Sequence, residues 1–243
     1  MKTIALLGGM TPDVTALYYN IINEHIRAQL GQRHSAKIYI YSVNLEEQLQ
    51  RVQEGKWDEF AAEYISAVQP LASLEQPRVQ GVALGAIIAH KVSKQIADAL
   101  PPVVPFLDVT EFVAKELRRL GITTVGLIGP AVTMTDDSPD FFIGKLKARH
   151  GITVLVPDTD AEIQEVNRGM FQEVVRGPAA VTEQTRTMFK EAAWRLVGRG
   201  AGALILGSTD LGFVIQEQDL PGVPVLDAAK VHAVGLAEWS ITE

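Results

Sequence analysis

The sequence predicts an α/β fold in which each of two lobes is built around a parallel sheet. Short apolar runs alternate along the chain with longer stretches whose apolar residues have helical spacing, which is typical of strand–helix–strand units. The short runs are continuously apolar, as are strands buried on both faces. Both halves of the chain repeat this layout, so we expect two pseudo-symmetric Rossmann-like lobes that face one another across an active-site cleft.

The first half begins with a predicted strand at residues 3–7, which Gly8-Gly9 separate from a helix with apolar residues from Val14 to Ile26. Thr11 followed by Pro12 is a suitable start for this helix. Further helices are predicted at residues 52–74 and 92–100, and further strands at residues 37–43, 79–84 and 106–107.

The second half repeats the alternation and sets the expected lobe boundaries. Its acidic, proline-containing segment 136–140 is predicted to be a solvated loop near the rim of the cleft. We place the first lobe at residues 1–106 plus 224–243 and the second lobe at residues 107–223. The predicted strands are residues 124–128, 153–156, 203–206 and 223–226, and the predicted helices are residues 110–120, 141–149, 163–175, 181–199 and 228–239.

Composition excludes several classes of function. The chain has 243 residues, of which 47% are hydrophobic and 21% charged, with a net charge of −7. The negative charge argues against nucleic acid or an anionic membrane as the main partner. The absence of cysteine excludes disulfides, thiolate metal sites and cysteine nucleophiles. We find neither a membrane-spanning segment nor a signal-peptide core, so we expect a cytoplasmic protein.

Two apolar runs stop at a glycine and then turn into small or polar residues. One leads through Leu206 and Gly207 into Ser208, and the other leads through Leu84 and Gly85. In open parallel sheets, ligands bind beyond the carboxyl ends of the strands, so these ends are the expected site. The glycine turn before Met10-Thr11 and the Ser208-Thr209 turn are expected to hold a carboxylate on their amides. The glycine turn lacks the third spaced glycine of a dinucleotide-binding fingerprint.

A set of short segments along the chain carries a family resemblance. These are Gly8-Gly9-Met10-Thr11, Thr15, Tyr18-Tyr19, Ile22-Asn23, His34-Ser35-Ala36, Ser42-Val43, Gly55, Trp57-Asp58, Ala89-His90-Lys91, Thr133-Met134, Asp140-Phe141, Gly207, Thr209, and Leu226-Asp227-Ala228-Ala229 with His232. With them the chain resembles the aspartate/glutamate racemase superfamily, in particular its bacterial amino-acid racemase branch, over essentially its whole length. The resemblance implies a cofactor-independent isomerase that acts on a small amino-acid-like substrate and forms a homodimer.

The positions that the resemblance assigns to catalysis differ from the family pattern. In the family two residues, usually cysteines, flank the substrate α-carbon, one removing a proton and the other returning it. Here Ala86 and Ser208 stand at these positions. Alanine carries no transferable proton, and a serine hydroxyl is too weakly acidic to act as a base without activation. Ile87 and Ile88 replace the polar residues that would bind a substrate's head group, and Glu165 falls near a lysine that holds a substrate carboxylate.

These departures leave several functions open. The cleft could carry out one-sided chemistry, such as isomerisation, elimination, cyclisation or decarboxylation, on a small amino acid or carboxylate. Alternatively, the chain is a catalytically silent metabolite-binding or partner protein, a residual racemase, or an engineered cysteine-free variant. The catalytic candidates are Ser208, Asp210, His90 and Glu165. The substrate-binding candidates are Met10, Thr11, Ala86, Ile87, Ile88, Thr133 and Thr209. No histidines have metal-ligand spacing, no cofactor is expected, and His232 is interpreted as structural.

Overall fold

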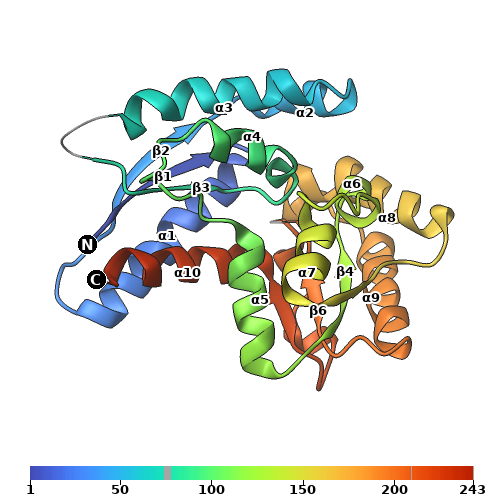
Figure 1. Ribbon diagram of the computed structural model, residues 1–243. Coiled ribbons are helices and arrows are strands. Elements are labelled where there is room, and N and C mark those ends of the chain that lie inside the picture. The colour runs from blue at the N-terminus through green and yellow to red at the C-terminus, as the bar shows by residue number, and fades with distance from the viewer. Residues whose placement is uncertain (74–77, 209, 243) are drawn as a thin grey trace. The chain divides into compact units, whose positions relative to one another are not determined.

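The computed structural model describes residues 1–73, 78–208 and 210–242, in which the chain divides into two compact units (Figure 1). Unit 1 is Met1–Val109 with His232–Glu243, and unit 2 is Thr110–Val231. The chain therefore returns to unit 1 at His232, whereas the sequence suggested a return at residue 224. The reason is that β7 (Val225–Asp227) pairs with a strand of unit 2.

Unit 1 contains a three-stranded parallel sheet in the order β2-β1-β3. The strands are β1 (Thr3–Gly8), β2 (Lys37–Ser42) and β3 (Gly81–Leu84), with Thr3 opposite Lys37 and Ile4 opposite Gly81. Figure 1 shows α1 and α3 on opposite sides of this sheet. The helical segments are α1 (Pro12–Leu30), α2 (Leu45–Gln53), α3 (Trp57–Ala72), η1 (Ile88–Val92), α4 (Ser93–Asp98) and most of α10 (Ala228–Ile241).

Unit 2 contains a four-stranded parallel sheet in the order β5-β4-β6-β7. Besides β7 its strands are β4 (Thr124–Ile128), β5 (Thr153–Leu155) and β6 (Leu204–Leu206). The α-helices are α5 (Val109–Leu120), α6 (Ala131–Thr135), α7 (Phe142–His150), α8 (Asp160–Gln172) and α9 (Glu183–Gly198). Short 3-10 turns are η2 (Val174–Arg176), η3 (Pro178–Ala180), η4 (Leu211–Phe213) and η5 (Glu217–Asp219).

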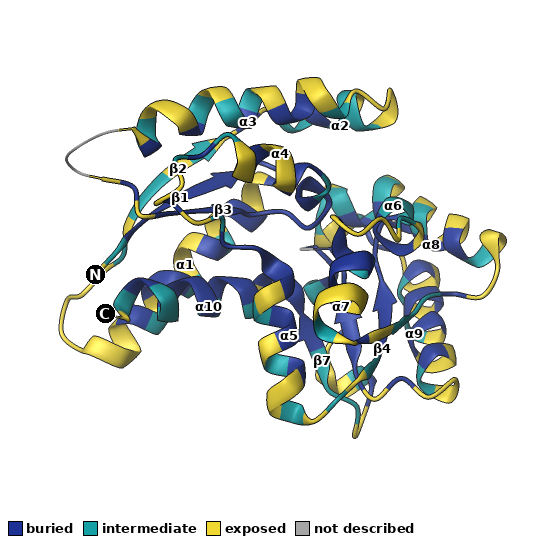
Figure 2. Ribbon diagram, in the orientation of Figure 1, coloured by how far each residue is buried: buried dark blue, intermediate teal, exposed yellow. Residues whose placement is uncertain are grey.

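The predicted parallel strands are confirmed, because the runs that end near Leu7 and Leu84 pair in one sheet and those that end at Ile128 and Leu206 pair in the other. Their burial agrees with the continuous apolar pattern, since β1, β3 and β6 are buried throughout (Figure 2). In unit 2 the apolar faces of α8 and α9 pack together with β6 in one core cluster. These strands thus carry their ends rigidly into the candidate site.

Several helix predictions needed correction. The helix predicted at residues 52–74 is two helices, because Gly55 adopts a φ of +70° that ends the first turn of chain before Trp57. The mostly polar α2 begins at Asn44, whose side chain accepts a hydrogen bond from the Glu46 amide. Thr11 occupies the N-cap position of α1 and Pro12 follows it as predicted, but the Thr11 side chain makes no capping hydrogen bond.

Candidate functional site

The loop after β1 is fixed by glycine and by buried hydrogen bonds. Gly9 has a φ of +104°, and a Cβ atom there would lie 2.5 Å from the backbone nitrogen and oxygen of Val43. The Gly9 amide donates to Thr15 Oγ1 at 2.7 Å, and that hydroxyl donates to the Thr11 carbonyl at 3.1 Å. Met10 and Thr11, both predicted to bind substrate, are buried here, and the peptide bond between them is cis. The loop is therefore a preformed surface at the carboxyl end of β1.

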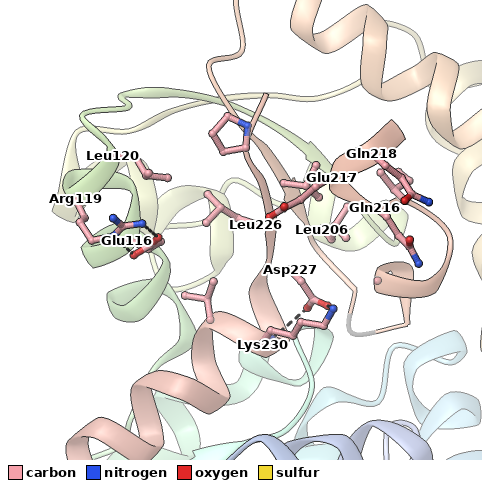
Figure 3. A pocket seen from close by; sticks show the side chains of 15 residues that line it. Glu116, Arg119, Leu120, Leu206, Gln216, Glu217, Gln218, Leu226, Asp227 and Lys230 are labelled. Carbon is pink, nitrogen blue, oxygen red and sulfur yellow. Dashed lines mark hydrogen bonds and ion pairs between the residues drawn. The ribbon is translucent and has the colours of Figure 1, made fainter. Parts of the chain in front are cut away.

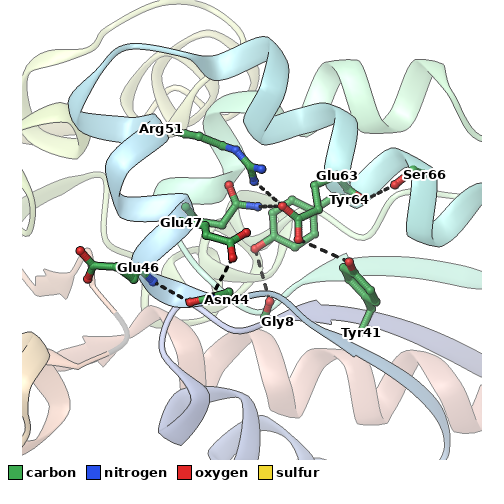
Figure 4. A network of polar contacts seen from close by, with 10 residues as sticks. Gly8, Tyr41, Asn44, Glu46, Glu47, Arg51, Glu63, Tyr64 and Ser66 are labelled. Atoms are coloured by element: carbon green, nitrogen blue, oxygen red, sulfur yellow. Dashed lines mark hydrogen bonds and ion pairs between the residues drawn. The ribbon is translucent and has the colours of Figure 1, made fainter.

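A polar network borders this loop at the carboxyl end of β2 (Figure 4). The Glu63 carboxylate pairs with Arg51, and it accepts hydrogen bonds from Gln48 Nε2 at 3.1 Å and from Tyr41 Oη at 3.4 Å. Tyr64 Oη donates to the Gly8 carbonyl at 3.3 Å, and burial raises the Tyr64 pKa. Gln48 is completely buried, and its Oε1 makes no hydrogen bond within the described part of the chain. Sequence reasoning missed this network, because its members lie on separate elements.

The loop after β3 is apolar and buried. Ala86 and Ile87 are each 1% exposed and Ile88 is 9% exposed, so the first catalytic position offers a methyl group flanked by two branched aliphatic side chains. Such side chains neither accept nor donate a proton. This half of the site can shape a ligand by packing but cannot relay a proton from these three residues.

His90 is held by the backbone on both sides of its ring. Its Nδ1 lies 2.8 Å from the Ala86 carbonyl oxygen, and its Nε2 accepts a hydrogen bond of 3.3 Å from the Val109 amide. These partners assign the proton to Nδ1 and make the ring neutral. The side chain is 1% exposed. This arrangement favours a structural role for His90 over the predicted catalytic one.

His232 is structural in the same cluster, in line with its interpretation from sequence. Its ring lies 5.7 Å from that of His90, measured between centroids. Its Nε2 donates to the Leu107 carbonyl at 3.0 Å, and its Nδ1 accepts from Tyr18 Oη at 3.1 Å. Burial, with a smaller contribution from His90, lowers the pKa of His232 to about 3. The cluster thus fixes the segment that contains Leu107 and Val109.

In unit 2 the polar candidates gather at the ends of β4 and β6. Ser208 and Asp210 are both 8% exposed, and the Asp210 amide donates to Ser208 Oγ at 3.4 Å. The backbone is tightly packed, since a Cβ atom on Gly129 would lie 2.8 Å from the Gly207 carbonyl oxygen. Thr209, a predicted substrate-binding residue, lies outside the described residues. Ser208 and Asp210 therefore form one polar turn at the carboxyl end of β6.

Thr133 lies beside this turn. It is completely buried, and a Cβ atom on Gly207 would lie 3.3 Å from its methyl group. Its Oγ1 makes no hydrogen bond to any residue that the structure describes. An unsatisfied buried hydroxyl is costly unless a ligand or water satisfies it, so Thr133 is well suited to bind a polar substrate group.

The α8 helix supplies one support that sequence reasoning missed. Asn167 Oδ1 accepts a hydrogen bond of 2.8 Å from the Ala131 amide and so anchors the start of α6, which carries Thr133. Glu165, a predicted catalytic residue on the same helix, is exposed, whereas the adjacent Val166 packs into the core. The role of Glu165 stays a prediction.

A separate cavity of about 750 Å³ lies along the edge strand β7 (Figure 3). Its lining includes Asp227, Lys230 and the Glu116–Arg119 ion pair, whose closest contact is 2.6 Å, but not Ser208 or Asp210. Asp227 Oδ1 accepts hydrogen bonds from the Ala229 and Lys230 amides and so begins α10. Burial raises the pKa of Asp227. These contacts give Asp227 a structural role at the helix start.

Metal-ion ligation and membrane insertion have no evident structural basis in the described ranges. No three histidine, aspartate or glutamate side chains there cluster as metal ligands. None of the helices there combines the length and the apolar character needed to cross a bilayer.

Comparison with known proteins assigns the family. The sequence model of the Asp/Glu/Hydantoin racemase family matches residues 7–236. The chain belongs to this family. A provisionally assigned Asp/Glu racemase from Yersinia pestis is 31% identical, with a TM-score of 0.87 and 100% of both chains covered. An aspartate racemase homologue from Pyrococcus horikoshii OT3 is 28% identical, with a TM-score of 0.77 and 100% of both chains covered.

More distant structures share the fold of this racemase family. The aspartate racemase of Picrophilus torridus is 19% identical, with a TM-score of 0.71 over 99% of this chain and 94% of that one. The predicted family and the α/β fold with parallel sheets are therefore confirmed. The absence of cysteine from the whole sequence sets this racemase family member apart from the two-cysteine pattern that the resemblance describes.

Proposed function

We propose that this chain is an isomerase- or lyase-type enzyme of the racemase family that works on a small amino-acid-like carboxylate from one face only. The observation that carries the proposal is the contrast between the two catalytic positions. Ala86, 1% exposed, offers only a methyl group, whereas Ser208 lies in a polar turn with Asp210. Two-base inversion needs a proton carrier on each face of the α-carbon. One-sided chemistry needs only one.

Asp210 is the proposed proton carrier and Ser208 and Thr133 are the proposed hydrogen-bonding groups. A carboxylate can take a proton from a carbon next to the substrate carboxylate and return it to the same face or to a neighbouring atom, which leaves the charge balanced. The unsatisfied Thr133 hydroxyl would bind a polar substrate group. Met10 and Thr11 at the end of β1, with the aliphatic Ile87 and Ile88, would contribute to the substrate-binding surface of unit 1.

The second candidate function is a silent metabolite-binding protein. It is favoured by His90, whose two ring nitrogens bind backbone groups, and by the aliphatic residues at positions 87 and 88. Both functions use the same polar turn, but only the enzyme requires the Asp210 carboxylate for proton transfer.

A deuterium-exchange screen separates the two functions. The wild-type chain is incubated in heavy water with a panel of amino acids and small hydroxy or unsaturated carboxylates, and proton NMR follows each carbon-bound proton. We expect exchange or turnover of at least one compound without inversion, and a loss of about 10²–10⁴-fold in the Asp210→Asn variant. Glu165→Gln serves as the matched carboxylate control. Binding of a compound without any exchange would support the silent protein and contradict the enzyme.

A further inference from the structure

The strand β2 presents an uncovered edge of the unit 1 sheet. It pairs with β1 along its whole length, from Lys37 to Ser42, and no other strand in the described residues pairs with it. The opposite edge of the sheet is covered, because β3 residue Val82 exchanges hydrogen bonds of 3.0 and 2.7 Å with Pro105 and Leu107. Uncovered edges are templates for pairing with another strand.

The outward-pointing backbone groups of β2 can be assigned. The Val43 amide, directly after β2, donates to the Gly8 carbonyl and thus points toward β1. Because successive residues of a strand point their N–H and C=O groups to alternate sides, Tyr39 and Tyr41 also point toward β1. Ile38, Ile40 and Ser42 therefore point their backbone groups away from the sheet.

The side chains of this edge are unusually apolar for an exposed strand. Lys37 is the only charged residue in the sequence of β2, Lys-Ile-Tyr-Ile-Tyr-Ser, and Ile40 is 43% exposed. Natural edge strands are commonly protected by charges, prolines or short length, and β2 has only the terminal lysine. Figure 2 shows β2 half-buried or exposed beside the buried β1.

The apolar surface continues onto α1. Tyr41 Oη reaches Glu63 on α3, so Ile38 and Ile40 point to the opposite side of the sheet, where α1 lies (Figure 1). Asn23 of α1 binds the Ala36 amide, just before β2, and the Tyr19 carbonyl, at 2.8 Å each. Tyr19, which is 46% exposed, thus lies on the part of α1 that borders β2.

We propose that β2 is the surface through which two copies of this chain pair, antiparallel, with Ile40 on the two-fold axis. A two-fold axis perpendicular to a continuous sheet keeps each side chain on its own face, so residues opposite one another have the same parity. Centring on Ile40 places Ile38 opposite Ser42 of the second copy and uses all three outward-pointing residues. The two sheets then join into one of six strands, and the interface closes on itself.

Charge complementarity supports this second copy as the occupant. Arg33, which precedes β2, and Lys37 are basic and exposed, whereas Glu46 and Glu47, which follow β2, are acidic and exposed. Antiparallel pairing brings the basic end of each strand toward the acidic end of the other. Opposite charges in such positions favour the antiparallel arrangement over the parallel one.

Single-cysteine cross-linking tests this register, because the natural sequence has no cysteine. Paired residues in an antiparallel ladder have Cα atoms about 5.5 Å apart, within the disulfide range. Ile40→Cys should therefore form a covalent dimer under mild oxidation. Ser42→Cys, on the same strand and face, is the matched control. Its two copies would lie about 13 Å apart and should not cross-link. Equal cross-linking of both variants, or of neither, would overturn the proposal.

A charge substitution tests the surface without oxidation. Light scattering after size exclusion should show a dimer for wild type, and Ile40→Lys should weaken the dimer at least about tenfold, because it sets two like charges opposite one another. Val103→Lys, at a residue 66% exposed outside β2, is the control and should leave the dimer intact. Circular dichroism checks that both variants fold. A monomeric wild type, or a dimer that Ile40→Lys leaves unchanged, would contradict the proposal.

Discussion

His90 Nδ1 lies 2.8 Å from the carbonyl oxygen of Ala86, so the histidine of the first family motif binds the backbone of the position where the family has its first proton carrier. The Val109 amide occupies the other ring nitrogen. The histidine therefore holds the loop after β3 and the segment before α5 together. It fixes the shape of this half of the site, and its chemistry serves the fold.

The His90→Ala variant should be destabilised by about 2–4 kcal/mol, because it loses two buried hydrogen bonds and leaves a cavity. Urea denaturation followed by circular dichroism measures this free energy of unfolding. His25→Ala, at a half-buried surface position of α1, should change it by less than about 1 kcal/mol. An unchanged stability in His90→Ala would contradict the structural role.

His232 should make stability depend on pH between about 6.5 and 3. Its pKa is lowered to about 3 in the folded chain, so the unfolded state binds more protons throughout this window. The stabilisation is complete above pH 6.5 and is lost as pH falls, with a slope of up to about 1.4 kcal/mol per pH unit. The groups that face the ring are His90, Tyr18, the Leu107 carbonyl and Asp108.

The His232→Asn variant isolates this contribution. Its free energy of unfolding should be lower at neutral pH and should vary less than that of wild type between pH 5 and 6.5, where few carboxylates titrate. Chemical denaturation at a series of pH values measures both slopes. Parallel slopes for the two proteins would show that His232 does not titrate as described.

The glycine at position 9 should tolerate no side chain. Gly9→Ala places a Cβ atom 2.5 Å from the Val43 backbone at a positive φ, so we expect a loss of about 2–4 kcal/mol. Gly31→Ala is the matched control, because Gly31 also has a positive φ but has no atom within 4 Å of the added Cβ. It should lose only about 1 kcal/mol. Equal melting temperatures for the two variants would contradict the close approach.

The parallel strands could be predicted from sequence because continuous apolar runs that end in glycine leave few alternatives. The end of β6 could be predicted in the same way, since Gly207 and Ser208 follow Leu206 directly. The binding partners of His90 could not, because Val109 is distant in sequence and its amide carries no sequence signal. Gln48 and Asn167 were missed for a related reason. Each is a polar residue on an amphipathic helix, and only tertiary packing distinguishes it from a solvated neighbour.

Thr133→Val should separate binding from stability. The exchange removes an unsatisfied buried hydroxyl at nearly constant volume, so the free energy of unfolding should be unchanged or rise by up to about 1 kcal/mol. A substrate that uses this hydroxyl should bind about tenfold more weakly. Calorimetry with the compound found in the exchange screen measures the affinity. A destabilised variant would show that the hydroxyl has a partner in the folded chain.

The central claim is that this racemase family member no longer inverts acidic amino acids by two-base proton transfer. The most direct measurement is α-proton exchange of L- and D-aspartate and of L- and D-glutamate in heavy water, followed by proton NMR over hours. We predict no exchange by wild type and little recovery in the double variant Ala86→Cys with Ser208→Cys, because Ile87 and Ile88 still offer no polar contact. Exchange with inversion by wild type would contradict the claim.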